Sequence, residues 1–210
     1  IVFGDWSSDV CSSDLGNNYD FALARYNSDG TVDTGFGANG KVTTAIGAGS
    51  DYAYAMAVQS DGKILLAGTA WMGSYSDFAL VRYTNNGALD TSFGNSGKVV
   101  TSVESRDDSI YAIAVQPDGK IIAGGKATQY HTGYALLRYN ADGSIDTAFG
   151  AHGSVTTDIL AYSDQVRALA VQSDGKIVVA GPSGTAAIAR YNGDGTLDAT
   201  FGSAGLRISA

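Results

Sequence analysis

The chain has 210 residues, of which 28 are glycine, 12 are tyrosine and only 2 are proline, and its formal net charge is −8. This composition indicates an all-β protein with many tight turns. The negative charge argues against a nucleic-acid or anionic-membrane partner, and no apolar run is long enough to insert into a bilayer.

The first residues differ from the rest of the chain. Residues 5–15 read DWSSDVCSSDL and resemble the translation, in one reading frame, of a common sequencing adapter. We therefore predict that residues 1–16 are foreign and unstructured, and that the repeat domain spans residues 17–210. A natural leader rich in serine and aspartate is the alternative. Cys11, the only cysteine, lies in this segment, so the remainder offers neither a disulfide nor a thiol nucleophile.

The first repeated segment starts at Phe21 and reads FALARYNSDGTVDTGFGANGKVTT. Similar segments start at Phe78, Tyr134 and Ala186, so the Arg-Tyr pair recurs about every 55 residues, and a period near 50 is typical of a propeller or an array. In each copy a short turn with glycine predicts a β-hairpin with a three-residue loop. Its register places arginine opposite aspartate, which predicts the pairs Arg25–Asp33, Arg82–Asp90, Arg138–Asp146 and Arg190–Asp198.

The second repeated segment is clearest in YAIAVQPDGKIIAGG, from Tyr111 to Gly125. It has counterparts that start at Tyr54 and Arg167. Pro-Asp-Gly or Ser-Asp-Gly between two apolar runs predicts a second β-hairpin, with Val115 opposite Ile121. Both faces of this hairpin are apolar, which indicates that neighbouring elements cover it on both sides.

Two hairpins per repeat supply four short antiparallel strands, which is the blade of a β-propeller. We expect the fourth strand to follow the Arg-Tyr turn directly, and Gly-Lys-Val to lead towards the next repeat. A β-solenoid is the alternative. The chain holds four hairpins of the Arg-Tyr type and three of the other type, so we expect about three and a half blades in an open arc, with apolar end faces and a tendency to self-associate. The predicted repeats lie near residues 19–53, 54–110, 111–166 and 167–210.

The motifs AVQxDGKI, FALxRYNxDGxxDxxFG and GKVTT resemble the delta-sixty repeat of bacterial surface and secreted proteins. The resemblance covers Tyr19 to Ala210. It implies a β-propeller in an extracellular or cell-surface protein. It brings no shared catalytic residue, because the residues that carry the resemblance are those expected to build the blades.

A weak metal signal lies in the third Arg-Tyr turn. Asn140, Asp142 and Asp146 have the spacing of the middle of a calcium-binding loop. However, Arg138 stands at the first ligand position and Phe149 at the closing one, and a hairpin turn explains the same residues. We therefore predict no cofactor, with Ca²⁺ as the alternative.

The loops that differ between copies are the candidate contact surface, since a repeated scaffold leaves its loops free to carry function. Our candidates are Trp71, Met72, Tyr75, Tyr130 and Arg167. We predict no catalytic residue and interpret the chain as a non-enzymatic module that contacts a protein or a glycan, together with the remaining blades of a longer chain. A fragment of a propeller lyase or glycan hydrolase, or of a ligand-sensing propeller, is the alternative.

Overall fold

The computed structural model describes residues 18–103, 106–128, 132–159 and 164–209, and the regular elements in these ranges are all β-strands. No helix in this part of the chain has the length and apolar character needed to cross a membrane. The predicted foreign segment, residues 1–16, lies outside the described residues.

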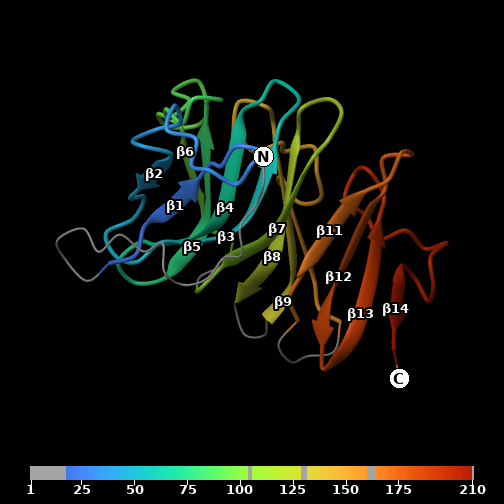
Figure 1. Ribbon diagram of the computed structural model, residues 1–210. Coiled ribbons are helices and arrows are strands. Elements are labelled where there is room, and N and C mark those ends of the chain that lie inside the picture. Colours follow the sequence, from blue (N-terminus) through green and yellow to red (C-terminus); the bar gives the residue numbers. More distant parts are fainter. Residues whose placement is uncertain (1–17, 104–105, 129–131, 160–163, 210) are drawn as a thin grey trace.

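Four antiparallel sheets follow one another along the chain (Figure 1). The first has two strands, β1 (Phe21–Ala24) and β2 (Lys41–Thr44). The second has β3 (Tyr52–Val58), β4 (Ile64–Trp71), β5 (Ser76–Tyr83) and β6 (Lys98–Thr101). The third has β7 (Ser109–Val115), β8 (Ile121–Thr128), β9 (Thr132–Tyr139) and β10 (Ser154–Thr157). The fourth has β11 (Ala168–Val171), β12 (Ile177–Ser183), β13 (Thr185–Tyr191) and β14 (Leu206–Ile208).

This arrangement confirms the predicted blades. Each complete sheet pairs its strands in chain order, and the two-stranded sheet is half a blade. No strand pairing joins the first sheet to the last within the described ranges, so the arc of about three and a half blades is open, as expected.

The hairpin within the second repeated segment has the predicted register. Val115 lies opposite Ile121, and the Gln116 N–H donates to the Lys120 carbonyl at 2.8 Å. Gly119 closes the loop with a φ of +84°, in the left-handed region that glycine tolerates best. The Asp-Gly turn therefore sets the register of the hairpin, and with it which side chains point towards each of the two neighbouring sheets.

The position predicted for the fourth strand of each blade was wrong. After the Arg-Tyr turn the chain makes a single bridge, Tyr139 to Ile145, and then turns away. The cause is Asp146, whose carboxylate accepts the Ala148 N–H and whose carbonyl accepts the Phe149 N–H. The Gly-Lys-Val segment and its counterparts, expected to be connections, form the outer strands β2, β6, β10 and β14.

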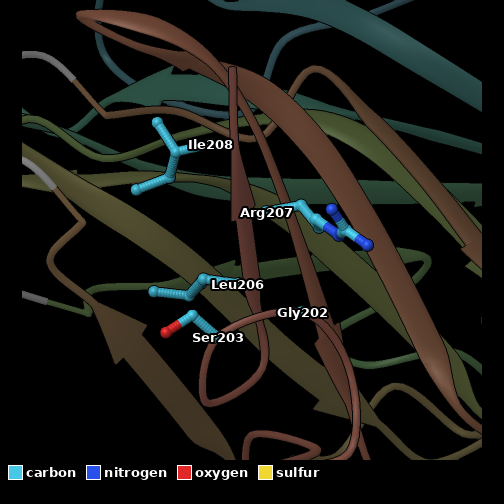
Figure 2. Close-up of a pocket in the computed structure, with 5 residues that line it drawn as sticks. All are labelled: Gly202, Ser203, Leu206, Arg207 and Ile208. Carbon is cyan, nitrogen blue, oxygen red and sulfur yellow. The ribbon is translucent and has the colours of Figure 1, made fainter. Parts of the chain in front are cut away.

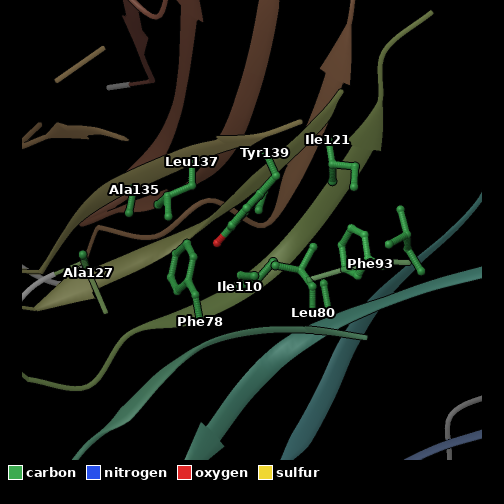
Figure 3. Packing of buried hydrophobic residues seen from close by; sticks show 12 residues of the cluster. Phe78, Leu80, Phe93, Ile110, Ile121, Ala127, Ala135, Leu137 and Tyr139 are labelled. Atoms are coloured by element: carbon green, nitrogen blue, oxygen red, sulfur yellow. The ribbon is translucent and has the colours of Figure 1, made fainter. Parts of the chain in front are cut away.

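The apolar cores lie between the sheets. Adjacent residues of β4 point to opposite sides, so Leu66 packs in the cluster shared with the first sheet and Leu65 in the cluster shared with the third. Figure 3 shows the second of these clusters, in which Phe78 and Leu80 lie beside Leu137 and Tyr139. The hairpins β3–β4 and β7–β8 are thus covered on both sides, as predicted, whereas β11–β12 in the last sheet is covered on one side. This burial stabilises the contacts between blades.

The four predicted Arg–Asp pairs all form, with Nε–Oδ2 distances of 2.7 to 2.8 Å. Each guanidinium also lies over the phenylalanine ring of its own Phe-Gly dipeptide, as in Arg82 over Phe93, whose ring centroid is 4.4 Å away. We call the arginine, aspartate, phenylalanine and glycine of one sheet its Phe-Gly corner. In each corner the arginine is therefore held both by the aspartate carboxylate and by the phenylalanine ring of its own sheet.

Candidate functional site

The innermost strands β3, β7 and β11 lie next to one another along the inside of the arc. In β3 the pairing shifts by one residue, because Ala53 and Ala55 pair with the adjacent residues Gly68 and Ala67. Tyr54 is therefore the extra residue of a β-bulge, a feature that re-aims side chains near functional sites. A side chain on Gly68 could not be accommodated, since its Cβ would lie 1.8 Å from the Tyr52 carbonyl oxygen.

The same bulge recurs in the next blade. Ile110 and Ala112 pair with Gly125 and Gly124, which leaves Tyr111 as the extra residue. Arg167 has the equivalent place in the fourth sheet, immediately before β11, where its N–H donates to the Ala180 carbonyl at 2.8 Å. Three successive blades thus present one side chain each at the same level of the inner surface.

These side chains form a continuous row. The ring centroids of Tyr54 and Tyr111 are 5.2 Å apart, and the Arg167 guanidinium carbon lies 4.2 Å from the Tyr111 centroid. At the other end Tyr52 stacks on Tyr54 at 6.3 Å, and Tyr19 follows at 5.5 Å from Tyr52. We call these five residues the tyrosine row. Tyr19, Tyr52 and Tyr54 are 43, 40 and 49 % exposed, so the aromatic surface is open to solvent.

The row carries one cation. Partial burial raises the pKa of Tyr54, and the neighbouring Tyr111 and Tyr52 act in the same direction, whereas the positive charge of Arg167 acts against them. The Tyr54 hydroxyl is therefore protonated at neutral pH, and the guanidinium supplies the positive charge. Such a surface can stack on flat or ring-shaped groups and bind an anion at its Arg167 end.

Buried aspartates hold the loops that lead into the inner strands. Asp51 is 1 % exposed, and its carboxylate accepts the N–H groups of Ile46 and Gly47 at 2.6 and 3.0 Å. Its other oxygen accepts the Trp71 N–H at 3.1 Å, which joins this loop to the end of β4. Asp108 and Asp164, both 0 % exposed, have the same position in the next two blades. The loops beside the tyrosine row are thus fixed by buried charge-assisted hydrogen bonds.

The predicted contact residues are divided between two places. Trp71, at the end of β4, and Met72 and Tyr75, on the loop that follows, are exposed, and the Asp51 bond connects this end of β4 to the row. Arg167 belongs to the row itself. Tyr130 lies outside the described residues.

The tyrosines of the row were not among the predicted contact residues. A signal for them exists, because Tyr54, Tyr111 and Arg167 all stand directly before the Ala-x-Ala-Val-Gln motif. An aspartate precedes each of them by three residues, which is the matching signal for the buried aspartates.

The residues considered for calcium are engaged in other contacts. Asp142 Oδ1 accepts the N–H and hydroxyl of Ser144 at 2.9 and 2.6 Å, which closes the turn. Asp146 Oδ2 lies 2.7 Å from both Arg138 Nε and Lys120 Nζ. Within the described ranges, no group of three or more histidine, cysteine, aspartate or glutamate side chains is placed to hold a metal ion. Ca²⁺ at this turn would have to displace these bonds.

A family model described as a domain of unknown function (DUF5122) beta-propeller matches residues 10–36, 59–93, 116–149 and 172–201. The first matched segment starts inside residues 5–15, and the foreign origin of these residues stays a prediction. No curated protein matches the chain. The four matched segments cover more than half of the sequence, each includes an Arg-Tyr turn region, and the sheets have the blade topology that the description names, so this chain belongs to the DUF5122 β-propeller family.

Proposed function

We propose that this chain is a non-enzymatic binding module of a bacterial surface or secreted protein, and that it contacts a glycan through the tyrosine row. The observation that carries the proposal is the row itself, with successive ring centroids 5.2 to 6.3 Å apart and with Tyr52, Tyr54 and Tyr111 on the inner strands. Tyrosine suits this task because its ring packs on apolar faces of a ligand and its hydroxyl hydrogen-bonds in water.

The Arg167 end of the row gives the proposal its charge preference. The guanidinium lies over Tyr111 and is exposed, so it is free to bind a carboxylate in a bidentate manner. We therefore expect glycans that carry acidic sugars to bind better than their neutral counterparts. Bacterial origin and an extracellular place rest on the resemblance to the delta-sixty repeat, and they belong to the proposal.

The non-enzymatic part of the proposal is supported by the acids of this region. Glycan lyases and hydrolases need carboxyl or histidine side chains that reach the sugar. Asp51 and Asp108 are buried, and their carboxylates accept backbone N–H groups of the surrounding loops. These contacts fit a role in holding the loops.

The test is an array of immobilised neutral and acidic glycans, probed with the wild-type chain and with Tyr54→Ala/Tyr111→Ala. We expect wild-type binding to acidic glycans and at least a roughly tenfold loss in the double variant, since each stacked ring contributes about 1 kcal/mol. Arg167→Gln should remove the preference for acidic glycans while leaving part of the binding.

The matched control is Trp71→Ala/Tyr75→Ala, which removes two exposed aromatic rings from the end of β4 and the loop that follows it. It should bind as the wild type does. Loss of binding in this variant but not in Tyr54→Ala/Tyr111→Ala would place the site on the loop and overturn the proposal. Absence of binding to every glycan would overturn the ligand class, and release of shortened or unsaturated products would overturn the non-enzymatic role.

A further inference from the structure

Each contact between two successive sheets uses the same pair of elements. The Phe-Gly corner of one sheet meets the Arg-Tyr turn of the next, which is Thr84–Gly87, Asn140–Gly143 or Asn192–Gly195. The corner glycine donates its N–H to a turn carbonyl in all three cases: Gly37 to Asn86 at 2.9 Å, Gly94 to Asp142 at 2.7 Å, and Gly150 to Asp194 at 2.8 Å. In each of these three corners, Nη1 of the arginine also donates to the carbonyl of the turn residue just before that acceptor, which is Asn85, Ala141 or Gly193.

The turn glycine fits tightly against the preceding sheet. A Cβ on Gly87, Gly143 or Gly195 would lie 2.8 to 2.9 Å from the nearest atom there. In contrast, a Cβ on Gly30, the counterpart in the first sheet, would meet nothing within 4 Å. Val32 shows the same difference, since it is 39 % exposed while its counterparts Leu89, Ile145 and Leu197 pack in the cores between sheets. The turn of the first sheet is thus complete but has no corner beneath it in the described part of the chain.

In the last sheet, by contrast, the Phe-Gly corner is present, but no Arg-Tyr turn lies on it within the described residues. A pocket lies there, lined by Gly202, Ser203, Leu206, Arg207 and Ile208 (Figure 2). At the first contact between sheets, the corresponding hollow is lined by the equivalent β2 residues together with Tyr83, Gly87 and Leu89 of the following sheet. The pocket at β14 is therefore the surface on which an Arg-Tyr turn lies in the other sheets.

The last corner also differs in charge. Arg207 stands where the three earlier sheets have Val42, Val99 and Val155, whose side chains lie 2.9 to 3.1 Å from the Cβ position of the docked turn glycine. Figure 2 shows the Arg207 side chain on the opposite side of β14 from Leu206 and Ile208. The exposed turn of the first sheet carries Asp29 directly before Gly30. The free turn of the first sheet and the free corner of the last sheet are thus the two halves of an internal contact, and they carry opposite charges.

We propose that a second copy of this chain docks head to tail, with its turn Asn27–Gly30 on the Gly202 corner of the first copy. The Gly202 N–H then donates to the Asp29 carbonyl, Arg190 donates to the Ser28 carbonyl, and Arg207 faces the Asp29 carboxylate. Such a heterologous contact forms a closed ring or an open filament. Two copies of about three and a half blades each provide about seven blades, within the range of about 4–8 found in closed propellers. We therefore infer a two-copy ring. This inference does not depend on glycan binding.

The test is sedimentation velocity of the full chain over a concentration series. The wild type should show a concentration-dependent dimer. Arg207→Glu and Asp29→Lys should each weaken the dimer by roughly tenfold or more, because each places like charges in contact. An equimolar mixture of the two variants should restore it, since the introduced glutamate then meets the introduced lysine in one contact and the natural Arg207–Asp29 pair forms in the other.

Arg167→Glu is the matched control, since it makes the same charge change on the tyrosine row and should leave the dimer unchanged. Asp29→Asn, the residue type of the equivalent Asn86, keeps the turn and should weaken the dimer less than Asp29→Lys. A wild type that stays monomeric over the series, a mixture that fails to restore association, or an equal loss in Arg167→Glu would overturn the docking. Open-ended assemblies restored by mixing would support the docking and overturn the ring.

Discussion

An internal contact between sheets and the open face of the last sheet contain the same motif in two environments. Leu80 in β5 is 0 % exposed, whereas its counterpart Ile188 in β13 is 39 % exposed. Arg82 bonds to Asp90 of its own sheet and to the Ala141 carbonyl of the next. Within the described residues, the Arg190 side chain bonds only to Asp198 and Thr200 of its own sheet. The motif is therefore one half of a contact, and the following blade supplies the other half.

Removing the corner arginine is expected to give the largest difference in the free energy of unfolding between the two environments. Arg82→Leu removes the bond to Asp90, the bond to Ala141 and the contact with Phe93, all in a buried place. We expect it to lower the free energy of unfolding by about 3 kcal/mol, as for the loss of one partner of a buried ion pair. Arg190→Leu, the matched variant on the open face, should cost about 1 kcal/mol or less.

Urea unfolding at neutral pH measures this difference, with Arg82→Leu and Arg190→Leu each made in the Arg207→Glu background, in which the last corner is expected to stay undocked. Equal losses would mean that the contact across the sheets contributes nothing beyond the Arg–Asp pair within each sheet. A larger loss for Arg190→Leu than for Arg82→Leu would reverse the comparison.

A smaller effect is expected from the tyrosines of the internal contacts at alkaline pH. The Tyr83 and Tyr191 hydroxyls donate to Thr44 and Thr157 of the preceding sheets. Burial raises the pKa of both tyrosines to about 12, although these hydrogen bonds act in the opposite direction. The unfolded chain releases these protons near pH 10, about the ordinary tyrosine value, while the folded chain still holds them. Their contribution to stability is therefore complete below about pH 10 and lost as the pH rises towards 12.

Urea midpoints measured from pH 8 to pH 12 check this prediction. The wild type should lose stability over the upper part of this range, and Tyr83→Phe should show a shallower fall because it removes one of the titrating groups. Identical pH dependence of the wild type and the variant would contradict the assigned cause.

Much of the fold could be predicted because the turns are local. An Asp-Gly turn sets the register of its own hairpin, which is why Val115–Ile121 and all four Arg–Asp pairs were placed correctly. The fourth strand was misplaced because its pairing is not local. Lys98–Thr101 joins the sheet through residues 78–81, on the far side of two turns, and no short motif encodes that contact.

The site could be predicted only in part. Arg167 was named as a contact residue, but its partner Tyr111 and the stacking of Tyr52 on Tyr54 depend on bulges that a regular alternation of faces does not reveal. The acceptors of the corner arginines are backbone carbonyls, as in Arg82 to Ala141, and a carbonyl leaves no mark on residue type. Such contacts require the arrangement of neighbouring blades.

Native-state hydrogen exchange at the corner glycines tests the central claim, that the contact between blades is made by one repeated corner. Gly94 and Gly150 donate their N–H groups across internal contacts, while Gly202, at the equivalent place, has no following turn within the described residues. The measurement uses Arg207→Glu, the variant expected to keep single chains apart. We predict that the Gly94 and Gly150 amides exchange at least about a hundred times more slowly than the Gly202 amide. Equal exchange at the three glycines would contradict the claim.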